Sequence, residues 1–244
     1  ERLERELELA RQVQQSVLPR TFPAVPGYGF SARSEPARQV GGDLFDVFVL
    51  DDAHFGVVIA DVSDKGMPAA LYMALTRSLL LAEAHRELSP HAVLVSVNRL
   101  LLELGEPDMF VTVFYGVVER LTQRMTYARA GHDRPFLLRG PEVTTLGGEG
   151  NMLGLLDNLF LTEETIVLRP DDRLVLYTDG MTDVEAPDGR LFDLDQFQSL
   201  LRCCDGLTLD ELRDTIFTDL ATYQGEADQF DDMTLLLLGV DGVE

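Results

Sequence analysis

The chain has 244 residues, 45% of them hydrophobic, and its 42 acidic side chains outnumber 20 basic ones for a formal net charge of -22. A chain of this length can bury one sizeable core, while so large an excess of negative charge argues against nucleic acid or an anionic membrane surface as its partner. No apolar run approaches the roughly 20 residues needed to cross a bilayer, so we expect no membrane insertion in this segment.

Two features favour a cytoplasmic location. Residues 1–6 read Glu-Arg-Leu-Glu-Arg-Glu, which does not resemble a signal peptide. Cys203 and Cys204 are adjacent, a spacing that suits neither an ordinary disulfide nor a tetrahedral zinc site. We therefore expect the protein in a reducing cytoplasm.

The first predicted element is a helix over residues 1–18, which Pro19 and Pro23 end. Its apolar positions alternate in spacings of four and three, as in a coiled-coil seam that one glutamine interrupts. These positions are Leu3, Leu7, Ala10, Gln14 and Val17. Such a seam fits either a homodimer formed through this helix or an amphipathic helix packed on its own domain. Because the helix begins without a cap, we expect residues 1–20 to link one domain, residues 21–244, to an upstream sensor or dimerising segment.

Beyond this helix, alternating and apolar runs predict many strands and a few helices. The strands are expected near 28–34, 44–50, 55–60, 110–118, 124–130, 135–139, 162–168, 173–178 and 233–240. The helices are expected over 67–86, 90–104, 193–204 and 208–223. Because the strands cluster as hairpins and do not alternate with helices, we expect antiparallel sheets covered by helices, not a doubly wound parallel sheet.

Aspartates stand in four turns, three of which adjoin strand-like apolar runs. The turns are Gly41-Gly42-Asp43, Ala60-Asp61-Val62, Thr178-Asp179-Gly180 and Asp231-Asp232-Met233. A carboxylate at the end of a core strand is costly to desolvate unless it meets a cation or a hydrogen-bond donor. Several such ends together form a site for a hard divalent ion, which prefers oxygen ligands. The pattern therefore predicts a metal-dependent enzyme.

These turns belong to a series of short segments that resembles the PPM-type metal-dependent serine/threonine phosphatases, in the bacterial branch typified by RsbU and SpoIIE. In chain order the matching segments are Ala10–Pro19, Gly41-Gly42-Asp43, Ala60–Ser63 with Pro68–Leu71, Ala130–Pro135, Gly154-Leu155, Thr178–Gly180 and Asp231–Thr234. Each segment alone is a weak signal, but all of them in this order and spacing make a strong one.

The resemblance implies an α+β fold, in which two packed antiparallel β-sheets are flanked by helices as an αββα sandwich. It also implies two Mn²⁺ or Mg²⁺ ions and removal of phosphate from phosphoserine or phosphothreonine on a partner protein. In this branch the partner is usually a phosphorylated STAS-domain antagonist of an anti-sigma factor, which implies a role in signal transduction and sigma-factor regulation.

By the same resemblance, four aspartates act in catalysis through a metal-bound water. Asp43 is expected to bind one metal, and Asp61 to bridge both metals, with the Val62 carbonyl as an additional ligand. Asp179 and Asp231 are expected to hold the second metal. Two ions roughly 3.5–4 Å apart lower the pKa of a shared water and neutralise charge on the phosphoryl oxygens, so no side-chain nucleophile is required.

Other residues near these turns have roles that the sequence leaves open. Asp232 is a candidate metal ligand that could equally support the ligands from behind. Lys65 could meet the phosphate or protonate the leaving oxygen, or it could be a paired surface charge. Asp64 stands where relatives often carry glycine. Arg38 could steer a phosphate, and His132 is either an acid or ligand, or a turn residue that hydrogen-bonds the backbone.

Two other functions fit part of the pattern. A regulatory scaffold of the same fold would bind a phosphoprotein without turning it over, although the intact aspartates argue against degeneration. The run Gly41–Phe45 also suggests a diguanylate cyclase. That function lacks the expected glutamate after the aspartate, and it leaves the turn at Asp179 unexplained.

Overall fold

The strands pair into two antiparallel sheets, each within its own compact unit, in the computed structural model, which describes residues 2–241. The first unit contains the N-terminal segment up to Pro23, Arg38–His132 and Gly147–Leu168. The second contains Ala24–Ala37, Asp133–Leu146 and the chain from Arg169 onward. The predicted domain at 21–244 includes parts of both, and its bounds stay a prediction; residues 1 and 242–244 lie outside the described residues.

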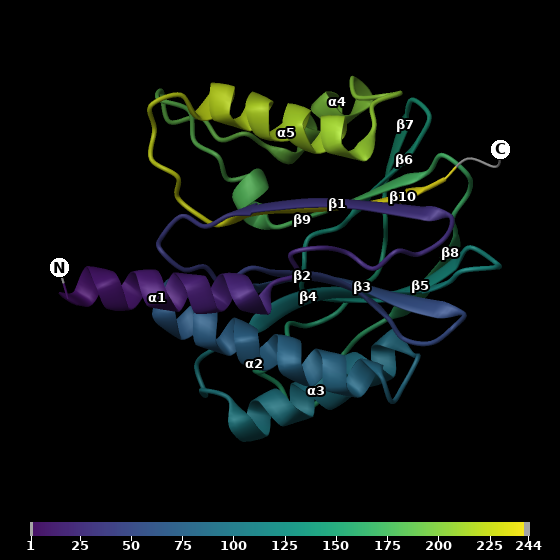
Figure 1. The fold of residues 1–244 in the computed structure, drawn as a ribbon, viewed down its shortest axis with the longest axis horizontal. Coiled ribbons are helices and arrows are strands. Elements are labelled where there is room, and N and C mark those ends of the chain that lie inside the picture. The colour runs from purple at the N-terminus through teal and green to yellow at the C-terminus, as the bar shows by residue number, and fades with distance from the viewer. Residues whose placement is uncertain (1, 242–244) are drawn as a thin grey trace. The chain divides into compact units, whose positions relative to one another are not determined.

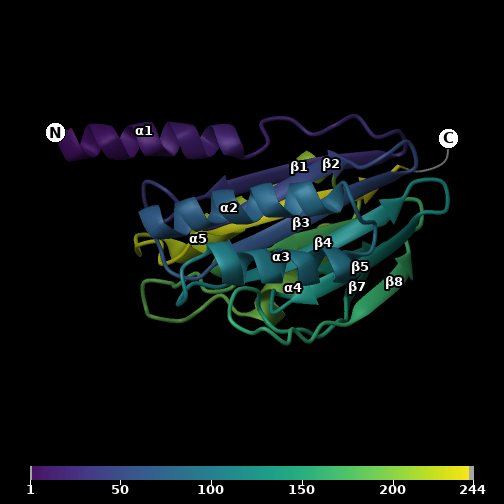
Figure 2. The same ribbon diagram turned by 90° about the horizontal axis from the view of Figure 1, so that it is seen from below.

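The sheet of the first unit has the strand order β2-β3-β4-β5-β8, and its neighbouring strands are antiparallel (Figure 1). Its strands are β2 (Leu44–Val49), β3 (His54–Val62), β4 (Val111–Glu119), β5 (Arg124–Ala130) and β8 (Glu163–Val167). Its helices are α1 (Arg2–Val17), α2 (Met67–Ala84) and α3 (Pro90–Leu104). Figure 2 shows α2 and α3 side by side, and their apolar side chains form one core with those of β2–β5.

Local sequence explains where the two covering helices begin. Pro68 occupies the first turn of α2, where a missing backbone N–H leaves no intrahelical bond unmade. Ser89 caps α3, since its side chain accepts a hydrogen bond from the Ala92 backbone N–H, and Pro90 follows it. Both helices therefore begin at residues that favour a helix start.

The sheet of the second unit has the strand order β1-β10-β9-β6-β7 and is also antiparallel. Its elements are β1 (Tyr28–Glu35), β6 (Phe136–Arg139), β7 (Glu142–Thr145), β9 (Arg173–Tyr177), the 3₁₀ turn η1 (Asp179–Met181), α4 (Leu194–Arg202), α5 (Leu209–Gln224) and β10 (Met233–Val240). Capping boxes begin both helices, Asp193 with Gln196 and Thr208 with Glu211. Phe136, Tyr177, Phe197 and Ile216 are among the residues that form the core between helices and sheet.

The expected fold class is confirmed: two five-stranded antiparallel sheets are flanked by helices. Every predicted helix and strand is present, and β7 is an additional short strand that the sequence did not predict. The predicted helix at 1–18 is present as α1, but the seam positions Leu3, Leu7 and Ala10 lie outside the described side chains. Within residues 2–241, none of the helices combines the length and apolar character needed to cross a membrane.

Candidate functional site

Two of the predicted metal ligands lie at one end of the β2–β3 hairpin. Leu44 and Ala60 form the last pair of the antiparallel register, and the same register continued by one position beyond β2 would place Asp43 opposite Asp61. Asp43 is 4% exposed, and Asp61 is half-buried near the end of β3. Residues directly opposite each other on antiparallel strands point to the same face of the sheet. The hairpin therefore brings these two aspartates near each other, although 18 positions separate them in the sequence.

Gly42 brings the turn before Asp43 close to the proposed carbonyl ligand. A Cβ at Gly42 would lie only 3.0 Å from the Val62 carbonyl oxygen and 3.3 Å from the Ala69 side chain. A larger residue would push the turn away from the end of β3. The glycine therefore allows Asp43, Asp61 and the Val62 carbonyl to belong to one small region of the first unit.

The loop after β3 is held in an unusual backbone conformation. Asp64 has φ +75°, a left-handed conformation that glycine adopts more readily, and its carboxylate accepts a hydrogen bond from the Lys65 N–H at 2.8 Å. Ser63 exchanges two hydrogen bonds with Phe110, through its backbone N–H and through its hydroxyl. Arg38 Nη1 lies 3.7 Å from where a Cβ on Gly66 would stand. Arg38 and the backbone that carries Lys65 therefore belong to the same loop region as Asp61.

The other predicted ligands gather in the second unit. Asp179 follows β9, and Asp231 comes just before β10, the strand that pairs with β9. Burial, together with the negative charges of Asp133, Asp231 and Asp183, raises the pKa of Asp179 from 3.8 to about 6. A carboxylate group whose neighbours oppose its ionisation favours a bound cation, which would relieve the repulsion.

Gly180 and Asp232 fix the backbone of this group. A Cβ at Gly180 would lie 2.0 Å from the Asp232 carbonyl oxygen, so only glycine fits there. The buried Asp232 side chain accepts a hydrogen bond from the Ala37 backbone N–H at 2.8 Å, and the Asp232 N–H donates to the Asp231 carboxylate at 2.8 Å. These contacts give Asp232 a positioning role beside Asp231, and its direct binding of metal stays a prediction.

Asp133 is a member of the acidic group that sequence reasoning missed. After burial, its charge is the largest influence on the pKa of Asp179. The sequence drew attention to its neighbour His132, which is buried and lies with Nδ1 2.9 Å from the Thr112 hydroxyl. Thr112 pairs with Asp61 across β3 and β4. The only signal for Asp133 was its place in the matching segment Ala130–Pro135.

The chemistry of these donors fits a hard divalent ion. Each unit offers carboxylate oxygens, and the first adds a backbone carbonyl, which are the donors that Mg²⁺ and Mn²⁺ prefer. Among residues 2–241, however, no three histidine, cysteine, aspartate or glutamate side chains form a ready-made metal cage. The structure thus groups Asp43 with Asp61 and Asp179 with Asp231, each pair within its own unit.

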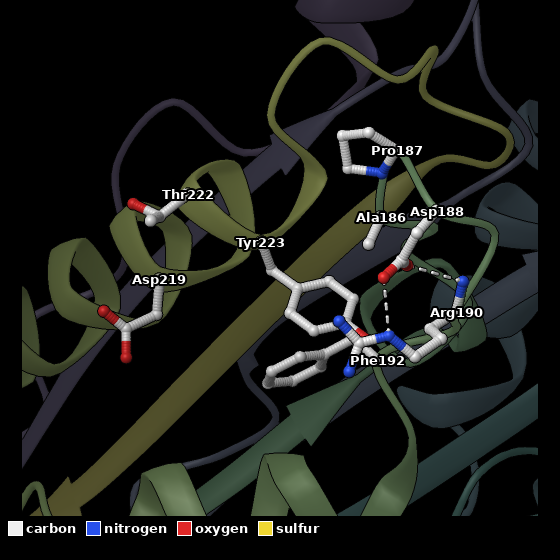
Figure 3. Close-up of a pocket in the computed structure, with 8 residues that line it drawn as sticks. All are labelled: Ala186, Pro187, Asp188, Arg190, Phe192, Asp219, Thr222 and Tyr223. Atoms are coloured by element: carbon white, nitrogen blue, oxygen red, sulfur yellow. Dashed lines mark hydrogen bonds and ion pairs between the residues drawn. The ribbon is translucent and has the colours of Figure 1, made fainter.

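A separate groove on the second unit contains none of the predicted site residues (Figure 3). It has a volume of about 630 Å³ and lies between the Ala186–Phe192 segment and α5. Arg190 on its rim is bonded to Asp188 at 2.8 Å, and the rings of Phe192 and Tyr223 meet edge to face. The acids that line this groove, Asp188 and Asp219, are not among the predicted ligands, so the groove is not part of the candidate site.

Sequence comparison matches residues 51–241 to the family described as Stage II sporulation protein E (SpoIIE). The chain is 30% identical to the phosphoserine phosphatase RsbU of Bacillus subtilis, over 96% of this chain and 69% of RsbU. It is also 30% identical to Protein IcfG of Synechocystis sp., over 95% of this chain. The chain spans only 41% of the length of IcfG.

Solved structures show the same similarity. The SiaA-PP2C domain of Pseudomonas aeruginosa superimposes with a TM-score of 0.88 and 25% identity, and 98% of each chain is covered. RsbX in complex with magnesium superimposes with a TM-score of 0.64 over 91% of this chain and 99% of RsbX. At 16% identity, the match to RsbX is evidence of a shared fold alone.

Proposed function

The chain belongs to the SpoIIE family, in the RsbU branch of the bacterial PPM protein serine/threonine phosphatases, and we propose that it removes phosphate from phosphoserine or phosphothreonine of a partner protein. The proposal assigns the reaction to a metal-bound water. The observation that carries it is the group of acids around Asp179, where burial and then the charges of the neighbouring aspartates raise the pKa of that carboxylate to about 6. Such a group is unfavourable without a cation and favourable with one.

Phosphatases of the PPM family depend on divalent metal, and the related RsbX was solved with magnesium. We assign two Mn²⁺ or Mg²⁺ ions to this chain, with Asp43, Asp61, the Val62 carbonyl, Asp179 and Asp231 as ligands. When bound, the ions lower the pKa of a water and neutralise charge on the phosphoryl oxygens.

The chain's own residues orient these groups. Gly42 allows the Asp43 turn to approach Val62, while Asp232 holds the backbone before β10 by its bond from Ala37. Lys65, in the loop that follows Asp61, is assigned a supporting role toward the phosphate or the leaving oxygen. The Lys65 N–H donates a hydrogen bond to the Asp64 carboxylate at 2.8 Å, which holds this residue in the loop beside the proposed ligand Asp61.

The substrate that we propose is a phosphorylated STAS-domain protein that opposes an anti-sigma factor, in the cytoplasm. The α1 helix leaves Leu9 and Val13 exposed, at 56% and 64%, and its N-terminal half extends past α2 (Figures 1 and 2). These exposed apolar side chains support a homodimer formed through α1, or a junction with an upstream sensor segment.

The test is phosphate release from a phosphorylated STAS-domain protein with excess Mn²⁺, by the wild type and by Asp61→Ala and Asp179→Ala. We expect turnover by the wild type only, while circular dichroism shows that both variants keep the fold. Wild-type turnover in either variant would refute its assignment as a ligand. Stable binding of the phosphoprotein without release would favour a non-catalytic scaffold instead.

A further inference from the structure

The interrupting glutamine of the N-terminal seam, Gln14, faces the turn that carries a proposed metal ligand. Its side-chain Nε2 donates a hydrogen bond to the Gly41 carbonyl oxygen, and its Oε1 accepts one from the Gly41 N–H at 3.1 Å. The side chain is half-buried, whereas Val13 beside it on α1 is 64% exposed. One amide thus pairs with both backbone groups of one residue, as neighbouring β-strands do.

The rest of this turn is held by tight packing. Gly42 lies against the Val62 carbonyl and the Ala69 side chain, so the turn has little room on that side. Farther along, Phe22 contacts the ring of Phe45, with ring centroids 6.3 Å apart. The start of β2 therefore contacts the N-terminal segment through the hydrogen bonds of Gln14 and through the ring of Phe22.

We propose that Gln14 is a positioning residue that holds the Gly41–Asp43 turn in the geometry needed to bind metal. The inference rests on the proposed function, because it requires Asp43 to be a ligand. An apolar residue in the same seam position would leave both Gly41 groups to water and the turn free to shift. A rotation of α1 about its own axis by one residue position, about 100°, would also turn the amide away. The position of α1 against this turn thus sets how tightly Asp43 binds metal.

The test compares Gln14→Met with wild type and with Arg11→Gln, a control at an exposed position of the same helix. Methionine keeps the length of the side chain and removes both hydrogen bonds. Calorimetry with Mn²⁺ and no substrate should give a dissociation constant about tenfold higher for Gln14→Met than for the other two proteins. Hydrogen exchange in the peptide that contains Gly41 should be faster in that variant only, with unchanged exchange in β3 and β4.

The outcomes separate the two proposals. If the wild type binds Mn²⁺ and Gln14→Met binds it equally well, Gln14 does not position the turn, and the proposed function stands. If the wild type binds no Mn²⁺, the metal assignment itself fails. Gln14→Ala gives a second measurement without a bulky replacement, and a weaker affinity in both variants, at a melting temperature close to that of Arg11→Gln, supports the inference.

Discussion

Asp179→Asn should stabilise the metal-free protein although it abolishes the proposed activity. Burial and the charges of Asp133, Asp231 and Asp183 raise the pKa of Asp179 from 3.8 to about 6, so the ionised carboxylate destabilises the folded state. A rise of this size corresponds to about 3 kcal/mol at neutral pH. Solvent near the half-buried side chain reduces this figure, and we expect a gain of about 1–3 kcal/mol in the free energy of unfolding.

The pH dependence has a definite sign. At pH values between the ordinary pKa of Asp179, 3.8, and its raised pKa of about 6, the folded protein binds more protons than the unfolded chain. As the pH rises through this window, the wild type therefore loses the stability that protonation of Asp179 contributes to the folded state. Above the window that contribution is gone. The gain in unfolding free energy of Asp179→Asn over the wild type should be largest at about pH 7.5 and fall to about half of that value at about pH 5.

Urea unfolding in EDTA at these two pH values measures the effect. Asp188→Asn is the matched control, because Asp188 is exposed and its bond from Arg190 lowers its pKa, so neutralising it should bring no gain. Saturating Mn²⁺ should reverse the order of wild type and Asp179→Asn, since metal that binds only the folded state stabilises it. A variant no more stable than wild type in EDTA, or a gain that ignores pH, would refute the reasoning.

Three further predictions concern stability. Asp64→Gly should raise the free energy of unfolding by about 0.5–1 kcal/mol in urea titrations, because φ +75° suits glycine; a loss would contradict this. Gly180→Ala should lower the free energy of unfolding by about 1–3 kcal/mol, and the melting temperature with it, because its Cβ would lie 2.0 Å from the Asp232 carbonyl oxygen. Gly147→Ala is the control: its Cβ would meet nothing within 4 Å, so the melting temperature should not fall. Arg77→Met leaves the buried Asp46 carboxylate without its cation and should cost about 3 kcal/mol of unfolding free energy. The double variant Arg77→Met with Asp46→Leu should recover most of this unfolding free energy. An equal loss in the single and the double variant would contradict the ion-pair explanation.

The sequence predicted most of the fold because the central strands are long and strongly apolar. β3 and β10 are buried along almost their whole length, so their patterns were easy to recognise. β7 has only four residues and alternates between exposed and half-buried positions at the edge of its sheet. A short edge strand of this kind buries too little apolar surface to leave a pattern.

The sequence indicated part of the candidate site, since glycine and aspartate at strand ends have a clear chemical meaning, and the ligand assignments stay predictions. The sequence could not reveal contacts made across long separations. Gln14 looked like a defect in a seam, and its contact with Gly41 is 27 positions away. Asp133 lies in the connection between β5 and β6, 46 positions before Asp179, and only the fold brings its charge to that carboxylate.

The most direct test of metal-dependent phosphatase activity is the release of inorganic phosphate from a phosphoserine protein, followed through three successive conditions. The wild-type protein should release phosphate with excess Mn²⁺, stop when EDTA is added, and resume when Mn²⁺ is restored. Release that continues at the same rate in excess EDTA would contradict the proposal that the clustered aspartates act through bound metal.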